Sequence, residues 1–163
     1  NPYKITDDPS LHEMIKTYSI DEKKIYIMAH FNHPRELTEI AVKGLNMLMQ
    51  SGAIVVNQTP LIKGVNDDPD VLAELFNQLS FIGVPPYYVF LCRPTLGNEP
   101  FAIPVEDGYE IFEKARRSSK GMSGLVLGLS ANTICPTTNV APKVAPATIN
   151  PKSRLKKLIF FPS

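Results

Sequence analysis

The sequence predicts an α/β fold with a parallel sheet, because three apolar segments alternate with amphipathic segments of helical period. The apolar segments lie at 24–30, 53–57 and 87–93, and such near-continuous runs are typical of strands buried on both faces of a parallel sheet. Ligands of parallel α/β folds bind at the carboxyl ends of the strands, so we expect the polar residues that follow each run to converge on one rim. They are His30, Asn32, His33, Asn57, Gln58 and Arg93.

Start and stop signals place the first two helices. Ser10 and Glu13 have the spacing of a capping box, which predicts a helix over 11–18, before the first strand. The second helix is expected from residue 36 or 38 to residue 51, because apolar residues recur on one stripe and Gly52 follows.

The last two helices have similar signals. Asp68 is expected as an N-cap, with Pro69 in the first helical position, and an apolar face then continues to Gly83. The fourth helix opens near Pro104 and ends around Arg117. The element order is therefore αβαβαβα, for which right-handed crossovers are expected.

Composition indicates one soluble domain. Of 163 residues, 44% are hydrophobic and 20% charged, which is ordinary for a globular protein. No apolar run reaches the roughly 18 residues that span a membrane, and no basic-then-apolar leader opens the sequence, so we expect a cytoplasmic protein without a membrane partner. Two cysteines, Cys92 and Cys135, predict neither a disulfide framework nor a metal site of their own.

Charge divides the chain in two. Residues 1–113 hold 8 basic and 16 acidic side chains, whereas 114–163 hold 9 basic side chains and no acid. The second part is also rich in proline and has no helical or alternating period. We therefore expect a folded domain over 1–118 and a poorly ordered basic tail over 119–163. Its cations carry no interleaved aromatic residues and no nucleic-acid motif, so no nucleic acid is expected as a partner.

The number of strands is too small for a complete fold. Three βα units in about 118 residues cannot close a barrel that takes on the order of 250 residues. An open three-stranded parallel sheet leaves apolar edges unpaired, which natural folds avoid. We therefore expect the chain to be a piece of something larger, or to associate with itself.

Three blocks of sequence carry a resemblance to a known family. His30-Phe-Asn-His-Pro-Arg-Glu-Leu-Thr-Glu39, Asn57-Gln-Thr-Pro-Leu-Ile-Lys-Gly-Val-Asn-Asp67 and Pro86-Tyr-Tyr-Val-Phe-Leu-Cys92 occur in order and at matching intervals. Together they resemble the second half of the lysine 2,3-aminomutase family of radical S-adenosylmethionine (SAM) enzymes, over about residues 1–118.

The resemblance implies a partial (βα) TIM-type barrel and an isomerase reaction on an amino acid or related small-molecule substrate. In this family a 4Fe-4S cluster on a C-x₃-C-x₂-C motif cleaves SAM to a radical, and the amino group migrates while the substrate is held on pyridoxal phosphate. The three-cysteine motif belongs upstream of Asn1, so whether this chain is an enzyme by itself is open, and we expect it to be inactive alone. Its partner is then the missing N-terminal half of the barrel.

The resemblance also implies roles for single residues. His30, Asn32 and Gln58 fall at the SAM rim, and Asn57 and Arg93 fall at the substrate. Arg93 replaces the family's aspartate that holds the substrate amino group, with Phe90 where aminomutases have tyrosine, which favours an anion at this position. No lysine follows the glycines of 121–128, so pyridoxal phosphate is not carried over.

Each of these residues also has a structural interpretation. His30 and His33 lack a third ligand for zinc, and either ring can cap a loop, with His33 shaping the turn into the next helix. Asn57 and Gln58 can tie down a loop, and Arg93 can form an ion pair. Asn66 and Asp67 are expected to cap a helix. The competing function is accordingly a non-catalytic α/β module that pairs its open sheet edge with a partner or with itself.

Overall fold

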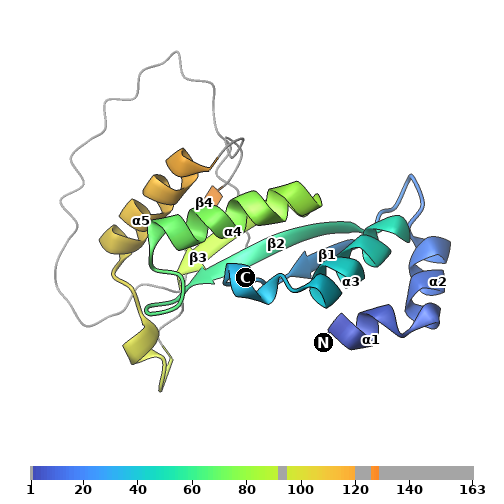
Figure 1. Ribbon diagram of the computed structural model, residues 1–163, viewed down its shortest axis with the longest axis horizontal. Helices are drawn as coiled ribbons and strands as arrows, with labels where there is room; N and C mark the ends of the chain where they lie inside the picture. Colours follow the sequence, from blue (N-terminus) through green and yellow to red (C-terminus); the bar gives the residue numbers. More distant parts are fainter. Residues whose placement is uncertain (1, 92–94, 120–125, 129–163) are drawn as a thin grey trace, which may run out of the picture.

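The computed structural model describes residues 2–91, 95–119 and 126–128, whose strands form one parallel sheet (Figure 1). Strands β1 (Tyr26–Ala29), β2 (Ile54–Leu61), β3 (Pro86–Leu91) and β4 (Val126–Gly128) are hydrogen-bonded in that order, and each neighbouring pair runs parallel. The predicted α/β class is confirmed. Within the described residues the sheet stays open, as expected of a partial (βα) barrel.

The fourth strand was not predicted from the sequence. Val126–Gly128 pairs with β3 through the register Tyr88↔Val126 and Phe90↔Gly128, inside the segment that composition assigned to a poorly ordered tail. Sequence periodicity missed it because three residues are too few to show an alternating pattern. Residues 120–125 and 129–163 of the predicted tail lie outside the described residues.

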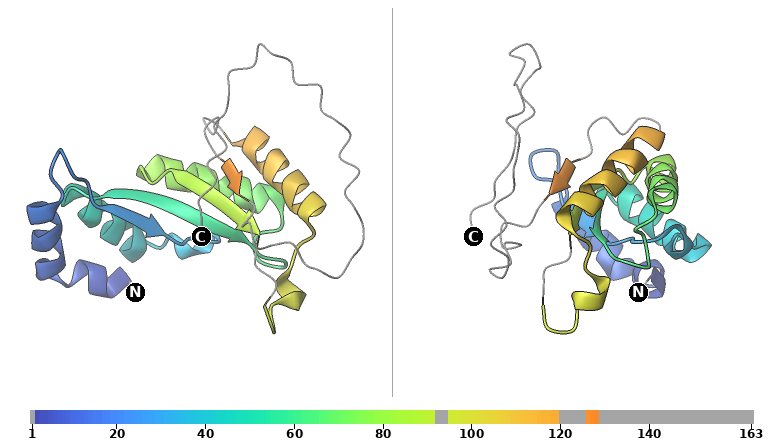
Figure 2. Two further views of the ribbon diagram at one scale, coloured as in Figure 1. Left: turned by 180° about the vertical axis from the view of Figure 1, so that it is seen from behind. Right: turned by 90° about the vertical axis from the view of Figure 1, so that its left-hand side faces the viewer.

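Helices precede and follow the strands in the expected order, and they lie on one side of the sheet (Figure 2). The four predicted helices are confirmed, and a short N-terminal helix that was not predicted comes before them. In the part of the chain that the structure describes, no helix has the length and apolar character needed to cross a membrane. The helices are α1 (Pro2–Thr6), α2 (Pro9–Tyr18), α3 (Glu39–Gln50), α4 (Pro69–Ile82) and α5 (Val105–Ser118), with 3-10 turns η1 (Pro34–Glu36) and η2 (Glu99–Phe101).

Side chains cap three of these helices at their first turns. Asp68 accepts the backbone N–H of Asp70 at the start of α4, as predicted, and Thr38 caps α3. The predicted capping box at Ser10 is wrong, because Asp8 is the N-cap of α2 and Pro9 takes the first helical position. Hydrogen bonds from the Ser10 hydroxyl and the backbone N–H of Leu11 lower the pKa of Asp8.

Burial along the strands alternates, so the expectation that the strands are buried on both faces is wrong. In β2, Val55, Asn57, Thr59 and Leu61 are buried, whereas the residues between them are half-buried. The reason is that the described helices cover a single face of the sheet. We call the other face the open face. It carries Tyr26, Met28, Ile54, Val56, Gln58, Pro60, Tyr88 and Phe90, with His30 continuing the β1 row.

The core lies between the sheet and the helices in two clusters. One cluster joins β2 and β3 to α4 and α5 around Phe76 and Phe112. The other joins β2 to α2, α3 and α4 around Ile15, Leu48 and Leu79. Burying a large apolar side chain contributes about 1.5–3 kcal/mol, so this face of the sheet supplies most of the stability.

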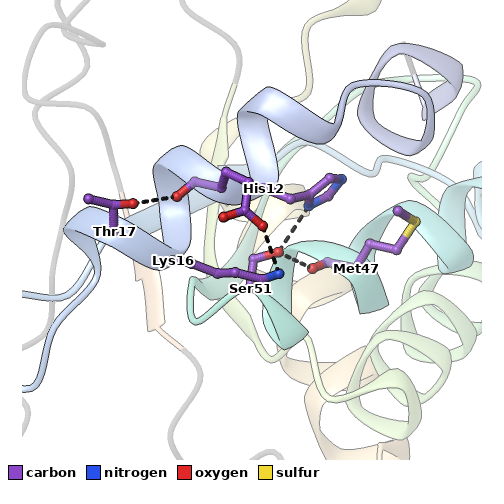
Figure 3. A network of polar contacts seen from close by, with 6 residues as sticks. His12, Lys16, Thr17, Met47 and Ser51 are labelled. Atoms are coloured by element: carbon purple, nitrogen blue, oxygen red, sulfur yellow. Dashed lines mark hydrogen bonds and ion pairs between the residues drawn. The ribbon is translucent and has the colours of Figure 1, made fainter.

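A buried histidine ties the N-terminal helices to α3 (Figure 3). His12 Nε2 lies 2.7 Å from the carbonyl oxygen of Ile5, and His12 Nδ1 lies 3.0 Å from Ser51 Oγ at the end of α3. Ser51 Oγ also lies 2.8 Å from the Met47 carbonyl oxygen. Both ring nitrogens are therefore satisfied inside the protein, and the ring has a structural role.

Substitution of Gly108 by alanine should destabilise the fold. A Cβ at residue 108 would lie 2.6 Å from Leu91 Cδ2, and Leu91 is itself buried. Overpacking costs about 1–3 kcal/mol, of which the better helix propensity of alanine recovers up to about 1 kcal/mol. We expect Gly108→Ala to lower the unfolding free energy by about 1–2 kcal/mol in urea titrations. Gly44→Ala is the matched control, since its Cβ would lie 3.4 Å from Ile5 Cγ2, and equal stability of the two variants would contradict the prediction.

Candidate functional site

Four side chains from three strands gather on the open face. Gln58 Nε2, in β2, contacts Nε2 of His30, which follows β1. The His30 ring meets Phe90 edge-on, with ring centroids 6.5 Å apart and an interplanar angle of 79°. Phe90 stacks on Tyr88 at 5.7 Å. The structure thus brings His30 and Gln58 together, and it adds two aromatic rings that the sequence analysis did not propose as site residues.

Register explains why these residues meet. Gln58 is paired with Tyr88, and Pro60 with Phe90, so each pair presents its side chains on the same face. The pairing shifts between Asn57 and Gln58, where β3 carries one extra residue, Tyr87. Strand β2 also runs to Leu61, four residues beyond the predicted end, and Gln58 consequently lies within the strand rather than at its terminus.

Asn57 lies on the opposite face, toward the helices. Its side chain is fully buried, and its Oδ1 accepts the backbone N–H of Phe31 at 2.8 Å. Its Nδ2 donates to the Phe31 carbonyl at 3.0 Å and to Thr59 Oγ1 at 2.9 Å. These contacts hold the chain after β1 against β2, which is the loop-fixing interpretation of this residue, and they do not direct it to the rim.

A second buried asparagine completes this attachment. Asn66 accepts the backbone N–H of Ile62 at 2.8 Å and donates to the carbonyl oxygens of Asn32 and Pro60, each at 2.9 Å. The predicted capping role is wrong for Asn66, because Asp68 caps α4 and Asn66 instead joins two loops. Asn57 and Asn66 together form a clamp on residues 31–32, which we call the amide clamp.

Asn32 has a buried acceptor without a partner. Its backbone N–H donates to Glu36 Oε2 at 3.2 Å, but its side-chain Oδ1 is buried and has no hydrogen-bond partner among the described residues. A buried polar atom left unpaired costs about 1–3 kcal/mol. Asn32 lies two residues after His30, so this unsatisfied oxygen is close in sequence to the residues of the open face.

His33 shapes the turn after β1. Its Nδ1 accepts the backbone N–H of Arg35 at 3.1 Å and caps η1, so its ring is separate from the His30 contacts. In the part of the chain that the structure describes, no three side chains of the histidine, cysteine, aspartate or glutamate type come together as metal ligands would. Arg93, the predicted substrate-binding residue, lies outside the described residues, as do Cys92 and Cys135.

Comparison with known proteins identifies relatives that are longer than this chain. A putative L-lysine 2,3-aminomutase of Aquifex aeolicus is 46% identical over 127 residues, which cover 77% of this chain and 34% of that protein. L-lysine 2,3-aminomutase of Clostridium subterminale is 40% identical over 74% of this chain and 27% of that protein. Glutamate 2,3-aminomutase of Clostridioides difficile is 36% identical over 75% of this chain and 28% of that protein. No family model matches the chain.

The extent of these alignments bears on the fold. The chain spans about a third or less of the length of these relatives. The first alignment covers 77% of the chain, which is more than residues 1–118, so it extends into the segment that contains β4. A domain of a pyruvate-formate lyase-activating enzyme from Bacteroides vulgatus aligns at a TM-score of 0.49 and 11% identity, over 76% of this chain and 74% of that one, a likeness too weak to carry an argument.

The amide clamp predicts different effects of two neighbouring substitutions. Asn57→Ala removes the partner of the Phe31 N–H in a buried place, so we expect the unfolding free energy to fall by about 2–3 kcal/mol. Gln58→Ala, one residue along on the open face, should change it by less than about 0.5 kcal/mol. Urea unfolding of both variants measures the difference, and equal losses would show that the two faces do not have these separate roles.

Proposed function

We propose that this chain, which belongs to the lysine 2,3-aminomutase family of radical SAM proteins, forms part of the SAM and substrate site of an aminomutase-type isomerase. The observation that carries the proposal is the contact between His30 and Gln58 on the open face, within sequence that the aminomutases share. The isomerase reaction of the whole protein is part of the proposal, because the chain spans about a third of its relatives.

The described residues fit a nucleoside ligand. SAM has an adenine ring, ribose hydroxyls and an amino acid group, so it needs aromatic surface together with both donors and acceptors. The open face offers the Tyr88 and Phe90 rings together with the His30 and Gln58 side chains. His30 and Gln58 would hold and orient SAM, which would supply the radical chemistry of the family when bound.

The other family cofactors do not fit the residues of this chain. The sequence has two cysteines, 43 positions apart, and neither they nor the described side chains form the three-thiolate set of a 4Fe-4S cluster. Along β1, β2 and β3, where the structure describes the side chains, the open face carries no lysine for pyridoxal phosphate. We therefore propose that the cluster belongs to another part of the longer protein and that this chain is inactive alone.

The substrate is proposed to be an amino acid with an anionic group. The relatives include enzymes named for lysine and for glutamate, whose side chains have opposite charges. Arg93 stands where the family's aspartate binds the amino group, and a guanidinium is suited to a carboxylate. Asn57 contributes by fixing the loop that carries the rim, since its side chain faces the helices.

The open face also points to the macromolecular partner. Tyr26 is 65% exposed, Met28 42% and Ile54 37%, and the outer edge of β1 has no neighbouring strand within the described residues. An exposed apolar face beside an unpaired strand edge is typical of a surface that packs against another polypeptide. The remainder of the longer protein is the proposed cover, with a cytoplasmic location, and self-association of a non-catalytic module is the alternative.

A chimera tests the SAM site. The chimera joins the N-terminal part of the Aquifex aeolicus relative to this chain. Its iron-sulfur cluster is reconstituted anaerobically, and SAM binding is then measured by calorimetric titration. We expect Gln58→Ala to weaken SAM binding by about 1–2 kcal/mol, the contribution of a hydrogen bond in a partly desolvated site. Gln78→Ala, on the outer surface of α4, is the matched glutamine control and should bind normally. Equal SAM affinity of the two variants would refute the site and favour the non-catalytic module.

Charge reversal tests the substrate. In the same chimera, Arg93→Asp should lower turnover of glutamate-type substrates at least about tenfold, since a hydrogen bond to a charged group contributes about 1.5–3 kcal/mol and about 1.4 kcal/mol is a factor of ten. Its SAM affinity should stay unchanged. Arg93→Lys keeps the positive charge but loses the planar guanidinium, so its turnover should lie between those of the unchanged chimera and Arg93→Asp. Unchanged substrate kinetics in both variants would contradict the assignment of Arg93.

A further inference from the structure

The outer surface of the helix layer carries an exposed phenylalanine beside a hollow. Phe81, in the last turn of α4, is 96% exposed. The hollow beside it is lined by Leu37, Asn77, Gln78, Phe81 and Ile82. Because Leu37 and Ile82 adjoin it, the ring belongs to an apolar patch with a depression and does not stand alone on a polar surface. We call these five residues the Phe81 patch.

A second hollow continues from this patch along α3. It shares Leu37 with the first hollow, and its other lining residues belong to α3, among them Val42, Met47, Glu39 and Lys43. Among the described residues, neither Glu39 nor Lys43 forms an ion pair. The two hollows therefore form one surface between α3 and α4, which is apolar at its centre and carries one unpaired charge of each sign at its side.

This surface lies away from the places where a barrel would continue. Helix α3 connects β1 to β2, and α4 connects β2 to β3, so the surface between them lies over the middle of the sheet. It is on the helix side, opposite the open face (Figure 2). The remainder of a barrel joins at the edges of the sheet and encloses the open face, whereas the helices form the outer ring. Closing the barrel therefore leaves the Phe81 patch uncovered.

The distribution of charge favours a second copy of this chain as the partner. Residues 1–113 hold 16 acidic and 8 basic side chains, so two copies of this domain repel each other over most of their surfaces. The Phe81 patch is uncharged, and the side-chain amides of Asn77 and Gln78 can both donate and accept. A two-fold axis also allows Glu39 of one copy to face Lys43 of the other. The surface is thus complementary to itself, as a two-fold contact requires.

We propose that two copies of this chain associate through the surface between α3 and α4, with Phe81 of each copy inserted into the hollow beside Leu37 and Ile82 of the other. Burial of the two rings drives the association, and the pairs of Glu39 with Lys43 set the orientation of the copies. Because the patch is small, the dimer belongs to the weak, transient class. The open face stays accessible in this dimer, so the inference is independent of the proposed function.

Sedimentation equilibrium of the 163-residue chain over a range of concentrations tests the dimer. We expect the average mass to rise toward that of two copies, and Phe81→Lys to weaken association at least about tenfold, as loss of a central aromatic anchor does. Leu96→Lys is the matched control, because Leu96 is as exposed as Phe81 but lies in the loop before η2, and its association should be unchanged. A chain that stays monomeric throughout, or equal losses in the two variants, would overturn the inference.

A substitution on the open face separates this dimer from association through the sheet. Met28 lies on the open face in β1 and is 42% exposed, so Met28→Lys should prevent contacts there but leave the Phe81 dimer intact. If Met28→Lys abolished the dimer while Phe81→Lys kept it, the copies would meet through the open face. That result would refute this inference and support the non-catalytic module, whereas loss of the dimer in Phe81→Lys alone leaves the proposed function untouched.

Charge exchange and NMR test the two-fold geometry. Glu39→Lys should weaken the dimer by placing cations opposite each other, and adding Lys43→Glu should restore it. Failure of the double exchange to restore association would overturn the pairing of these two residues. In a mixture of isotope-labelled and unlabelled chains, filtered NMR spectra should show contacts of the Phe81 ring with Leu37 methyl groups of the other copy. Contacts of Phe81 with residues 129–163 of its own chain instead would make the tail the occupant and overturn the inference.

Discussion

Two buried amide side chains determine where the rim of the sheet lies. Asn57 pairs with both backbone polar groups of Phe31, and Asn66 joins the carbonyls of Asn32 and Pro60. Buried backbone groups outside a sheet ladder need partners, and an amide has both donors and an acceptor to offer them. The segment after β1 is thereby attached to β2 and to the loop that follows it. The positions of His30 and Asn32 depend on this attachment.

Local signals predicted most of the elements, because the physics behind them involves residues close in sequence. Asp68, Pro69 and Gly83 predicted α4, and the helix runs over Pro69–Ile82 with Gly83 left-handed at φ 89°. The convergence of strand ends in a parallel sheet predicted that His30 and Gln58 lie close together, as they do, and the family resemblance added the expectation that this rim binds SAM. Even the local signals compete, since Asp8 and Ser10 are both able to cap α2 and the fit of Pro9 at the first helical position decides for Asp8.

The failures share a physical origin, which is dependence on distant partners. Whether an apolar strand is covered on both faces depends on what packs there, and the described helices cover one face. Likewise, Asn57 binds the backbone of Phe31, 26 residues away, and Asn66 binds the carbonyl of Asn32, 34 residues away, so no local pattern distinguishes an amide that holds a loop from one that binds a ligand. A residue's neighbours in sequence limit its possible roles, and the register selects among them.

Side chains of the strands alternate between the two faces of the sheet, so odd-numbered and even-numbered positions differ in which substitutions they tolerate. Odd-numbered residues of β2 pack into the helical layer, while even-numbered residues of β1 and β2, and residues 88 and 90 of β3, reach the open face. A lineage can therefore change what the rim contacts by substitution at even positions while its core stays intact. A one-residue insertion within β2 would exchange the two sets at once. Among descendants with altered ligand preference, sequence divergence should concentrate at even positions, and insertions or deletions should be rare inside β2.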